Sequence, residues 1–240
     1  MRGIIDMHCH ILPGVDDGAD NYIESLKLLR KEYEQGVRSL ILTPHYRKEY
    51  FETDRAIIRE HFEELNARLP SVGIAMRLYL GCEFHRENDM LKMLSSDRAY
   101  TMAETRYVLT EFAGTDQEDI ISKYVNALIA GGYRPIIAHI ERYSGMRDLN
   151  KVEHLIRAGA YIQVNASSIL GKEGFKQKGF CKKLLKEGFV HFIGSDAHDL
   201  RRRPPCLGEC ADYLEKKTGK ENVRKLMINN PLKMLADELL

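Results

Sequence analysis

Short hydrophobic runs alternate along the chain with segments that have helical periodicity. The runs cover residues 3–7, 39–43, 77–81, 106–111, 135–138, 161–164 and 190–194, and most are almost continuously apolar. Such runs are typical of strands that are buried on both faces. The segments with helical spacing cover residues 22–35, 54–69, 89–94, 119–130, 149–158 and 179–186, followed by a helical tail over 205–239. The pattern therefore predicts a repeat of β-strand and α-helix.

Parallel strands joined by helical crossovers give one of two α/β architectures. They form either an open doubly wound sheet or a closed barrel, and the pattern alone does not choose between them. No shift in composition, Pro/Ser-rich linker or low-complexity tract divides the chain. We therefore expect residues 1–240 to form a single α/β domain.

The composition excludes several classes of protein. Of the 240 residues 44% are hydrophobic, and 36 Lys and Arg stand against 35 Asp and Glu, which leaves a net charge of +1. A balanced charge provides no overall field to attract nucleic acid or an anionic membrane, so nucleic-acid binding is not expected. The first residues form no apolar signal segment, and no window approaches about 18 apolar residues. We expect a cytoplasmic protein with no membrane insertion, in which the five cysteines are reduced thiols.

Residues of metal-ligand type stand at or just beyond the ends of most hydrophobic runs. They are His8 and His10 after the first run, His45 after the second, Glu83 after the third, Glu111 and His139 at the ends of the fourth and fifth, and Asp196 and His198 after the seventh. The carboxyl ends of parallel strands share one face, where active sites are built. These residues should therefore converge although they are far apart in the sequence.

Two motifs place a pair of ligand-type residues two positions apart. His8 and His10 form an HxH pair, and Asp196 and His198 belong to the SDAH segment at 195–198. Residues two apart on a strand point to the same side and can hold one ion together. An isolated HxH is a weak signal, but the second pair strengthens it. Five histidines and three carboxylates exceed the four ligands of one tetrahedral zinc, so we expect a cluster of two or three ions.

The ligand types indicate both the metal and the chemistry. Imidazole and carboxylate without thiolate suit manganese, iron or zinc, and close pairs of such ions hydrolyse phosphoesters through a bridging hydroxide. Glu83 and Glu111 are candidates to bridge the ions, although Glu111 could instead form a salt bridge at its strand end. Arg142 follows His139, and Arg203 ends the run 201–203 after His198. A guanidinium binds phosphate in a bidentate manner, so we expect Arg142 and Arg203 to hold a phosphoryl group.

Four other histidines have different expected roles. His61 and His154 lie in helical segments and are expected to be surface or packing residues. His191 lies inside the last hydrophobic run, opposite in side-chain parity to Asp196, and is expected to be buried and hydrogen-bonded. His85 stands two residues after Glu83, where both a supporting and a bystander role remain open.

The cysteines do not fit a thiol-based phosphatase. That chemistry needs a CxxxxxR loop, but none of the five cysteines is followed by arginine at the sixth position. Cys206 and Cys210, four apart in a helical segment, are expected to be core residues. Any phosphatase activity must therefore depend on metal.

Taken together, these motifs resemble the polymerase and histidinol phosphatase (PHP) superfamily, and most of all its bacterial manganese-dependent protein-tyrosine phosphatases of capsular and exopolysaccharide gene clusters. The matching segments are DMHCHILPGVDDGA at 6–19, TPH at 43–45, GCE at 81–83, LTEF at 109–112, PIIAHIERY at 135–143, QVNASS at 163–168, SDAH at 195–198 and NNP at 229–231. The resemblance implies a distorted (β/α)7 barrel of the PHP type with three metal ions at the carboxyl ends of the strands.

The resemblance also assigns each ligand. It implies that His8, His10, Glu83 and Asp196 hold the first ion, that Glu83, Glu111 and His139 hold the second, and that Asp17, His45 and His198 hold the third. Asp17 enters only in this way, because Asp16-Asp17-Gly18 alone indicates a turn. Arg142 and Arg203 correspond to the family's phosphate-binding arginines.

The implied activity is hydrolysis of phosphotyrosine with three divalent ions, manganese first and iron or zinc as alternatives. The implied partner is the phosphotyrosine tail of a bacterial tyrosine kinase that controls capsular or exopolysaccharide synthesis. Three other functions remain open: another PHP phosphoesterase acting on histidinol phosphate or a phosphodiester, a non-catalytic metal-binding PHP module, and an amidohydrolase, for which Glu83 is a less suitable residue than lysine. The oligomeric state is not predicted.

Overall fold

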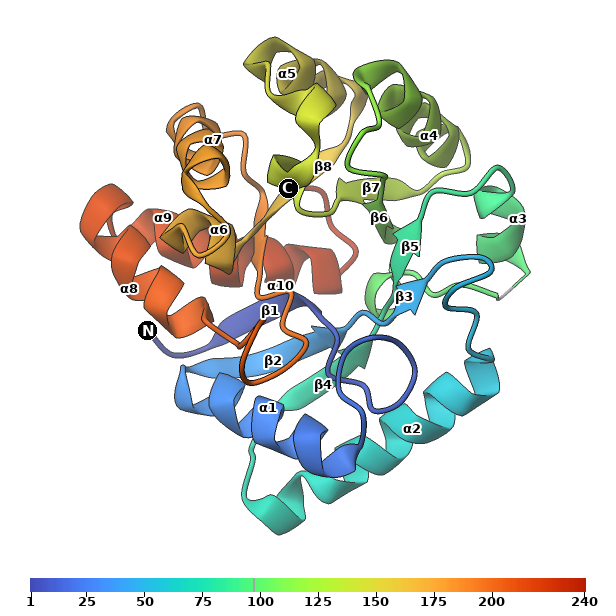
Figure 1. Cartoon of the computed structure of the whole chain (residues 1–240), viewed down its shortest axis with the longest axis vertical. Helices are drawn as coiled ribbons and strands as arrows, with labels where there is room; N and C mark the ends of the chain where they lie inside the picture. The colour runs from blue at the N-terminus through green and yellow to red at the C-terminus, as the bar shows by residue number, and fades with distance from the viewer. Residues whose placement is uncertain (97) are drawn as a thin grey trace.

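The computed structural model describes residues 1–96 and 98–240 (Figure 1). Within them, every pair of neighbouring strands is parallel. The strands are β1 (Ile4–Cys9), β2 (Val37–Leu42), β3 (His45–Tyr46), β4 (Arg77–Leu80), β5 (Glu83–His85), β6 (Tyr107–Glu111), β7 (Arg134–Ile137), β8 (Tyr161–Asn165) and β9 (Phe192–Gly194). Each of the seven predicted runs therefore overlaps a strand, although several strands begin or end one or two residues outside their run.

The strands form a curled sheet whose first and last members meet. Hydrogen bonding gives one set in the order β1-β2-β4 and a second in the order β3-β5-β6-β7-β8-β9. Where the chain leaves β9, Asp196 N donates to His8 O within β1 at 2.7 Å, and His10 N, just after β1, donates to Ala197 O at 2.8 Å. Of the two α/β architectures, the structure is therefore the distorted (β/α)7 barrel, in which β2 with β3 and β4 with β5 each count as one strand.

Two predicted strands are each interrupted and then continue. β2 is followed by β3 and β4 by β5, and the pairing crosses the break, because Gly81 N donates to Leu42 O (2.8 Å) and Glu83 N to Pro44 O (3.0 Å). Pro44 has no N–H to give to a ladder. Gly81 is closely packed, since a Cβ there would lie 2.9 Å from Sδ of Met102. His45 and Glu83, expected beyond the strand ends, are thus held in short strands of their own.

Helices follow the strands and cover the outside of the sheet (Figure 1). They are α1 (Tyr22–Glu34), α2 (Arg55–Arg68), α3 (Met90–Ser95), α4 (Glu118–Ala130), α5 (Leu149–Ala158), α6 (Ala166–Leu170), α7 (Phe175–Lys186), α8 (Leu207–Thr218), α9 (Lys220–Arg224) and α10 (Asn230–Leu235). Short 3-10 turns lie at Pro70–Val72, Met102–Glu104, Ile140–Arg142 and Ser144–Met146, and a π-helical turn at Lys225–Asn229.

The predicted helices match the structure apart from three details. The short α6 was not predicted, and α7 begins at Phe175 rather than at 179. The tail predicted over 205–239 is broken into shorter helices. Gly219 separates α8 from α9 with a φ of 85°, a value that glycine adopts without strain.

The sheet is buried on both faces, which explains the nearly continuous apolar runs. Ile4 and Val108 belong to a large apolar cluster that includes the surrounding helices. The adjacent Ile5 and Leu109 belong to a second cluster, to which α10 contributes Met234. Among the described residues, no helix is both long and apolar enough to cross a bilayer.

Candidate metal centre

Four histidines surround the buried carboxylate of Glu83 at the start of β5. Its Oε2 lies 3.2 Å from Nε2 of both His8 and His10 and 3.1 Å from Nδ1 of His45, while its Oε1 lies 2.6 Å from Nε2 of His139. Burial opposes ionisation of Glu83, but the charges of His8, His45 and His139 hold its pKa well below the usual range. Glu83 is the centre of the cluster.

The nine ligand-type residues proposed from the sequence all lie in this cluster. Their donor atoms form four overlapping groups, in each of which all atoms are within 4.8 Å of one another. The groups are His10, Asp17, His45 and His198; His8, Glu83 and His139; His8, His10 and Asp196; and His45, Glu83 and Glu111. Sharing of Glu83 between groups fits a bridging carboxylate, and the overlap at His8, His10 and His45 shows that the groups lie side by side.

Two features of the cluster fit divalent cations. The Oε2 atom of Glu83 is fully buried, yet it accepts no hydrogen bond of good geometry from the imidazoles around it. The Nε2 atoms of His8 and His10 face each other at 3.1 Å. Imidazole nitrogen and carboxylate oxygen without thiolate are the donor set that manganese, iron and zinc share. The chemistry of the site therefore fits the expected ions.

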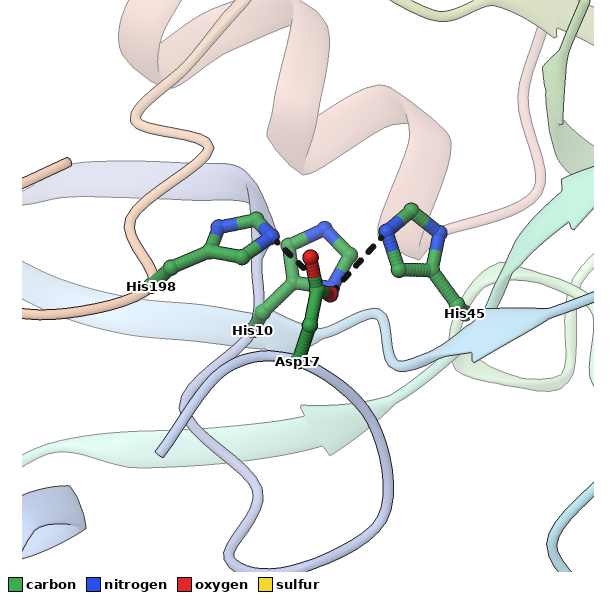
Figure 2. A group of neighbouring side chains, drawn as sticks. All are labelled: His10, Asp17, His45 and His198. Carbon is green, nitrogen blue, oxygen red and sulfur yellow. Dashed lines mark ion pairs between the residues drawn. The ribbon is translucent and has the colours of Figure 1, made fainter. Parts of the chain in front are cut away.

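Asp17 joins the cluster from the loop between β1 and α1. Its Oδ1 lies 3.4 Å from Nε2 of His45 and 3.4 Å from Nε2 of His198 (Figure 2). The contact with His198 holds the pKa of Asp17 below its usual value. The side chain is about half exposed, at 51%. The local pattern indicated only a turn, and it is the closure of β9 on β1 that brings His198 to this loop.

Residues that the sequence interpretation missed hold the cluster in place. Oδ2 of Asp16 lies 2.7 Å from Nδ1 of His10. Oε1 of Gln163 lies 3.4 Å from Nδ1 of His8 and accepts the backbone N–H of His139 at 2.6 Å. Asn165 donates to Oδ2 of Asp196 at 2.7 Å. The alternation of Gln163 and Asn165 in the QVN segment was the signal available, since such side chains point to one side of β8.

Both predicted arginines reach the cluster, and both bind Asp196. Arg142, in the 3-10 turn after β7, places Nη1 2.7 Å from Oδ2 of Asp196 and pairs through Nε and Nη2 with Glu173 at 3.1 and 3.2 Å. Arg203 donates to Oδ1 of Asp196 at 2.6 Å and lies 2.7 Å from Nε2 of His198. Burial raises the pKa of Asp196, but Arg142, His8 and Arg203 outweigh that effect and keep it well below the usual range.

Two ligand-type residues occupy the left-handed region of backbone conformation. His139 has a φ of 31° and Asp196 a φ of 53°. Non-glycine residues in this region are held there by the surrounding structure and concentrate at functional sites. These conformations after β7 and β9 are therefore typical of residues at a functional site.

The remaining histidines lie outside the four groups. His61 in α2 places Nδ1 2.8 Å from Pro13 O, and His154 in α5 is exposed and pairs with Glu118 at 2.7 Å, as expected. His191 precedes β9 instead of lying within it, and is partly rather than fully buried; its Nδ1 accepts the N–H of Ile162 at 3.1 Å. His85 lies in β5, and its buried Nδ1 has no hydrogen bond within residues 1–96 and 98–240.

The cysteines are unsuited to nucleophilic chemistry. All five are buried and unpaired, including Cys206 and Cys210, which were expected in the core. Burial raises the pKa of the Cys82 and Cys206 thiols to about 12 and that of Cys9 well above its usual value. Because the thiolate is the reactive form, none of these residues is poised to attack phosphorus.

Fold and site together define a distorted βα barrel with a histidine and carboxylate centre at the carboxyl ends of its strands. The chain belongs to the capsular polysaccharide synthesis family CpsB/CapC, whose model matches residues 4–236. It is 36% identical to tyrosine-protein phosphatase CpsB of Streptococcus agalactiae, over 98% of this chain and 99% of that protein. It is 33% identical to tyrosine-protein phosphatase YwqE of Bacillus subtilis, over 91% of this chain and 86% of that protein.

Solved structures agree with this assignment. A crystal structure from work on YwqE of Bacillus subtilis and CpsB of Streptococcus pneumoniae, described as metal-dependent tyrosine phosphatases, superposes with a TM-score of 0.92 and 31% identity, covering 99% of this chain and 96% of that one. A lactonase from Listeria monocytogenes superposes with a TM-score of 0.64 and 13% identity over 99% and 95% of the two chains. The second match shows a shared fold alone.

Proposed function

We propose that this protein is a metal-dependent protein-tyrosine phosphatase. The observation that carries the proposal is the convergence of nine ligand-type side chains around Glu83, with Arg142 and Arg203 at their edge. Relatives at 33–36% identity that span nearly the whole chain are named tyrosine-protein phosphatases. Ordinary thiol chemistry is disfavoured, because the five cysteines are buried.

The proposed ligand sets are those that the family resemblance implies. Asp17, His45 and His198 lie within one of the four groups, whereas the other two sets combine members of different groups. His8, His10, Glu83 and Asp196 would hold one divalent ion; Glu83, Glu111 and His139 a second; and Asp17, His45 and His198 a third, with manganese as the first choice and iron or zinc as alternatives. Ions bound there would lower the pKa of a coordinated water and offset the charge of the phosphoryl group. Burial and the neighbouring Glu83 raise the pKa of Glu111 to about 7, and a cation bound beside this carboxylate would favour its ionised form.

The two arginines supply the binding of phosphate. Arg142 is anchored at the edge of the cluster by an ion pair with Asp196 and Arg203 by a charge-assisted hydrogen bond to the same carboxylate. Each guanidinium presents several donors in one plane. A phosphate oxygen that arrives between them replaces the carboxylate as acceptor, while Glu173 continues to hold Nε and Nη2 of Arg142. The phenolate of tyrosine, with a pKa near 10, is a good enough leaving group to depart without a dedicated acid.

The proposed substrate is the phosphotyrosine tail of a bacterial tyrosine kinase that regulates capsular or exopolysaccharide synthesis. The description of the family and the names of the relatives support this choice. The proposed location is the cytoplasm, where the five unpaired thiols stay reduced.

One assay tests the proposal against its alternatives. The protein is stripped with a chelator, reloaded with manganese, and offered a phosphotyrosine peptide, histidinol phosphate and a bis-aryl phosphodiester. We expect manganese-dependent release of phosphate mainly from the peptide. Full activity after chelation, or no activity on the peptide with manganese, iron or zinc, would overturn the proposal.

A further inference from the structure

An open groove of about 610 Å³ lies between the first turns of α1 and the loop that follows β9. Ile23 and Lys27 of α1 line one side, and Leu200, Arg201 and Arg202 line the other. The groove is separate from the cluster of metal-ligand residues, and none of the roles described above uses it.

The same loop contributes to the groove and to the metal centre. His198 N and Asp199 N both donate to Arg203 O, at 3.0 and 3.4 Å, which closes the loop at its base. Arg203 then contacts His198 and Asp196 in the cluster. The loop residues between these points, Leu200 to Arg202, line the groove. The groove and the metal centre are therefore built in part from the same loop.

The groove exposes apolar side chains that are normally covered. Ile23 is 68% exposed and Leu200 is 42% exposed. They face the same groove from two different elements. Exposed apolar residues that gather at a concave site beside a reaction centre are typical of a surface that contacts a partner.

The residues that line the groove carry a net positive charge. Arg201, Arg202 and Lys27 are exposed, and none of their side chains has an ion pair or hydrogen bond with another residue that the structure describes. The two carboxylates of the groove are engaged by backbone donors instead. Asp199 accepts the N–H groups of Arg201 and Arg202, each at 2.5 Å, and Glu24 accepts that of Asp20 at 3.1 Å.

We propose that this groove binds the peptide segment beside the phosphotyrosine of the substrate, and that it selects acidic segments that carry an apolar side chain. Arg201 and Arg202 would pair with the acidic side chains, and Ile23 and Leu200 would cover the apolar one. The inference rests on the proposed phosphatase function, since it assigns the flanking sequence of the same substrate. Exposed ion pairs of this kind act more on selectivity and encounter than on total affinity.

The test compares two phosphotyrosine peptides that differ only in their flanks. One carries Glu, Asp and Leu beside the phosphotyrosine, and the other carries Gln, Ser and Gly. The manganese-loaded protein should hydrolyse the acidic peptide with the higher kcat/KM, mainly through a lower KM. The double variant Arg201→Glu/Arg202→Glu should lower the ratio of acidic to neutral kcat/KM by about tenfold. Arg224→Glu, an exposed arginine of α9 outside the groove, serves as the matched control and should keep the native ratio.

A second variant and a binding measurement separate the two proposals. Leu200→Ser should weaken the preference for the Leu-containing peptide without changing the charge. Fluorescence anisotropy of a labelled acidic peptide reports on the groove even when nothing is hydrolysed. One outcome would support the groove and overturn the phosphatase proposal. In it, the native protein binds the acidic peptide but hydrolyses no peptide, and the double variant no longer binds. Equal kcat/KM and equal affinity for acidic and neutral peptides in the native protein would overturn the groove and leave the phosphatase proposal standing.

Discussion

Oδ2 of Asp16 lies 2.7 Å from Nδ1 of His10, on the side of the ring opposite to Glu83. The same oxygen accepts the backbone N–H of His45 at 3.0 Å. One carboxylate therefore fixes the ring of one ligand-type histidine and the backbone of another. Partners of this kind set the tautomer and the direction of a metal-binding imidazole.

Replacing Asp16 should weaken metal binding. We expect Asp16→Ala to lower manganese affinity, or activity at limiting manganese, by roughly 10- to 100-fold, because His10 loses its orienting partner. Manganese titration of phosphatase activity measures the effect. The control is Asp20→Ala, in the same loop but exposed, which should behave like the native protein. Equal losses in the two variants would mean that the contact with His10 is not what matters.

His139 and His154 test the distinction between histidines that belong to the metal cluster and histidines that lie outside it. His139 is buried and 2.6 Å from Glu83, whereas His154 is exposed and pairs only with Glu118 among the described residues. We expect His139→Ala to lose activity by about 100-fold or more, since removing a ligand is at least as harmful as removing its support. His154→Ala should keep it. Comparison of kcat/KM on a phosphotyrosine peptide tests this, and equal losses would contradict the assignment.

Glu173 should act through Arg142. It accepts hydrogen bonds from Nε and Nη2 of this arginine and from the hydroxyl of Ser167. We expect Glu173→Gln to raise KM for phosphotyrosine by about tenfold, with a smaller effect on kcat, because a charge-assisted pair that positions the guanidinium is lost. The exposed Glu187, at the end of α7, provides the control Glu187→Gln. A fall in kcat with unchanged KM would refute this role.

Metal and thiol reagents should act differently on the protein. Chelation should abolish activity, and added manganese should restore it. Iodoacetamide at neutral pH should leave activity nearly unchanged, because all five thiols are buried and burial raises the pKa of Cys9 and Cys82. Mass spectrometry of the treated protein shows whether any cysteine has reacted. Inactivation that follows the modification of a cysteine would contradict the metal-dependent mechanism.

His191 should make the fold sensitive to acid. Burial and the nearby Lys225 lower its pKa from 6.5 to about 4, and its Nδ1 accepts the N–H of Ile162. Below about pH 6.5 the imidazole is protonated in the unfolded protein but stays neutral in the folded one. The free energy of unfolding therefore falls as the pH drops from 6.5 to 4. The effect of this residue should reach at most about 3 kcal/mol.

The variant His191→Gln isolates that contribution, since glutamine retains an acceptor but does not titrate. Urea unfolding of chelator-treated protein at pH 7 and pH 4.5 should show a smaller loss of stability in the variant than in the native protein. Identical losses would show that His191 is not the responsible group.

The strands and most of the cluster could be predicted from the sequence alone. Burial on both faces makes a strand apolar throughout, so the seven runs were visible, and the polar residues that end them had to share one face of a parallel sheet. That reasoning found His8, His10, His45, Glu83, Glu111, His139, Asp196 and His198, all of which lie in the cluster. Asp17 came only from the resemblance to a family, because its neighbours along the chain specify a turn.

The tertiary structure decided how those strands close and what supports the cluster. The contacts of Asp196 with Arg142 and of His8 with Gln163 join residues 54 and 155 positions apart, and they depend on the register between strands, which local patterns do not encode. The same is true of the bond between His8 O and Asp196 N, which closes the barrel. Hydrophobic periodicity is a local property that the sequence carries by itself. The direction of each side chain at the centre is set by distant partners, and only the folded chain brings these together.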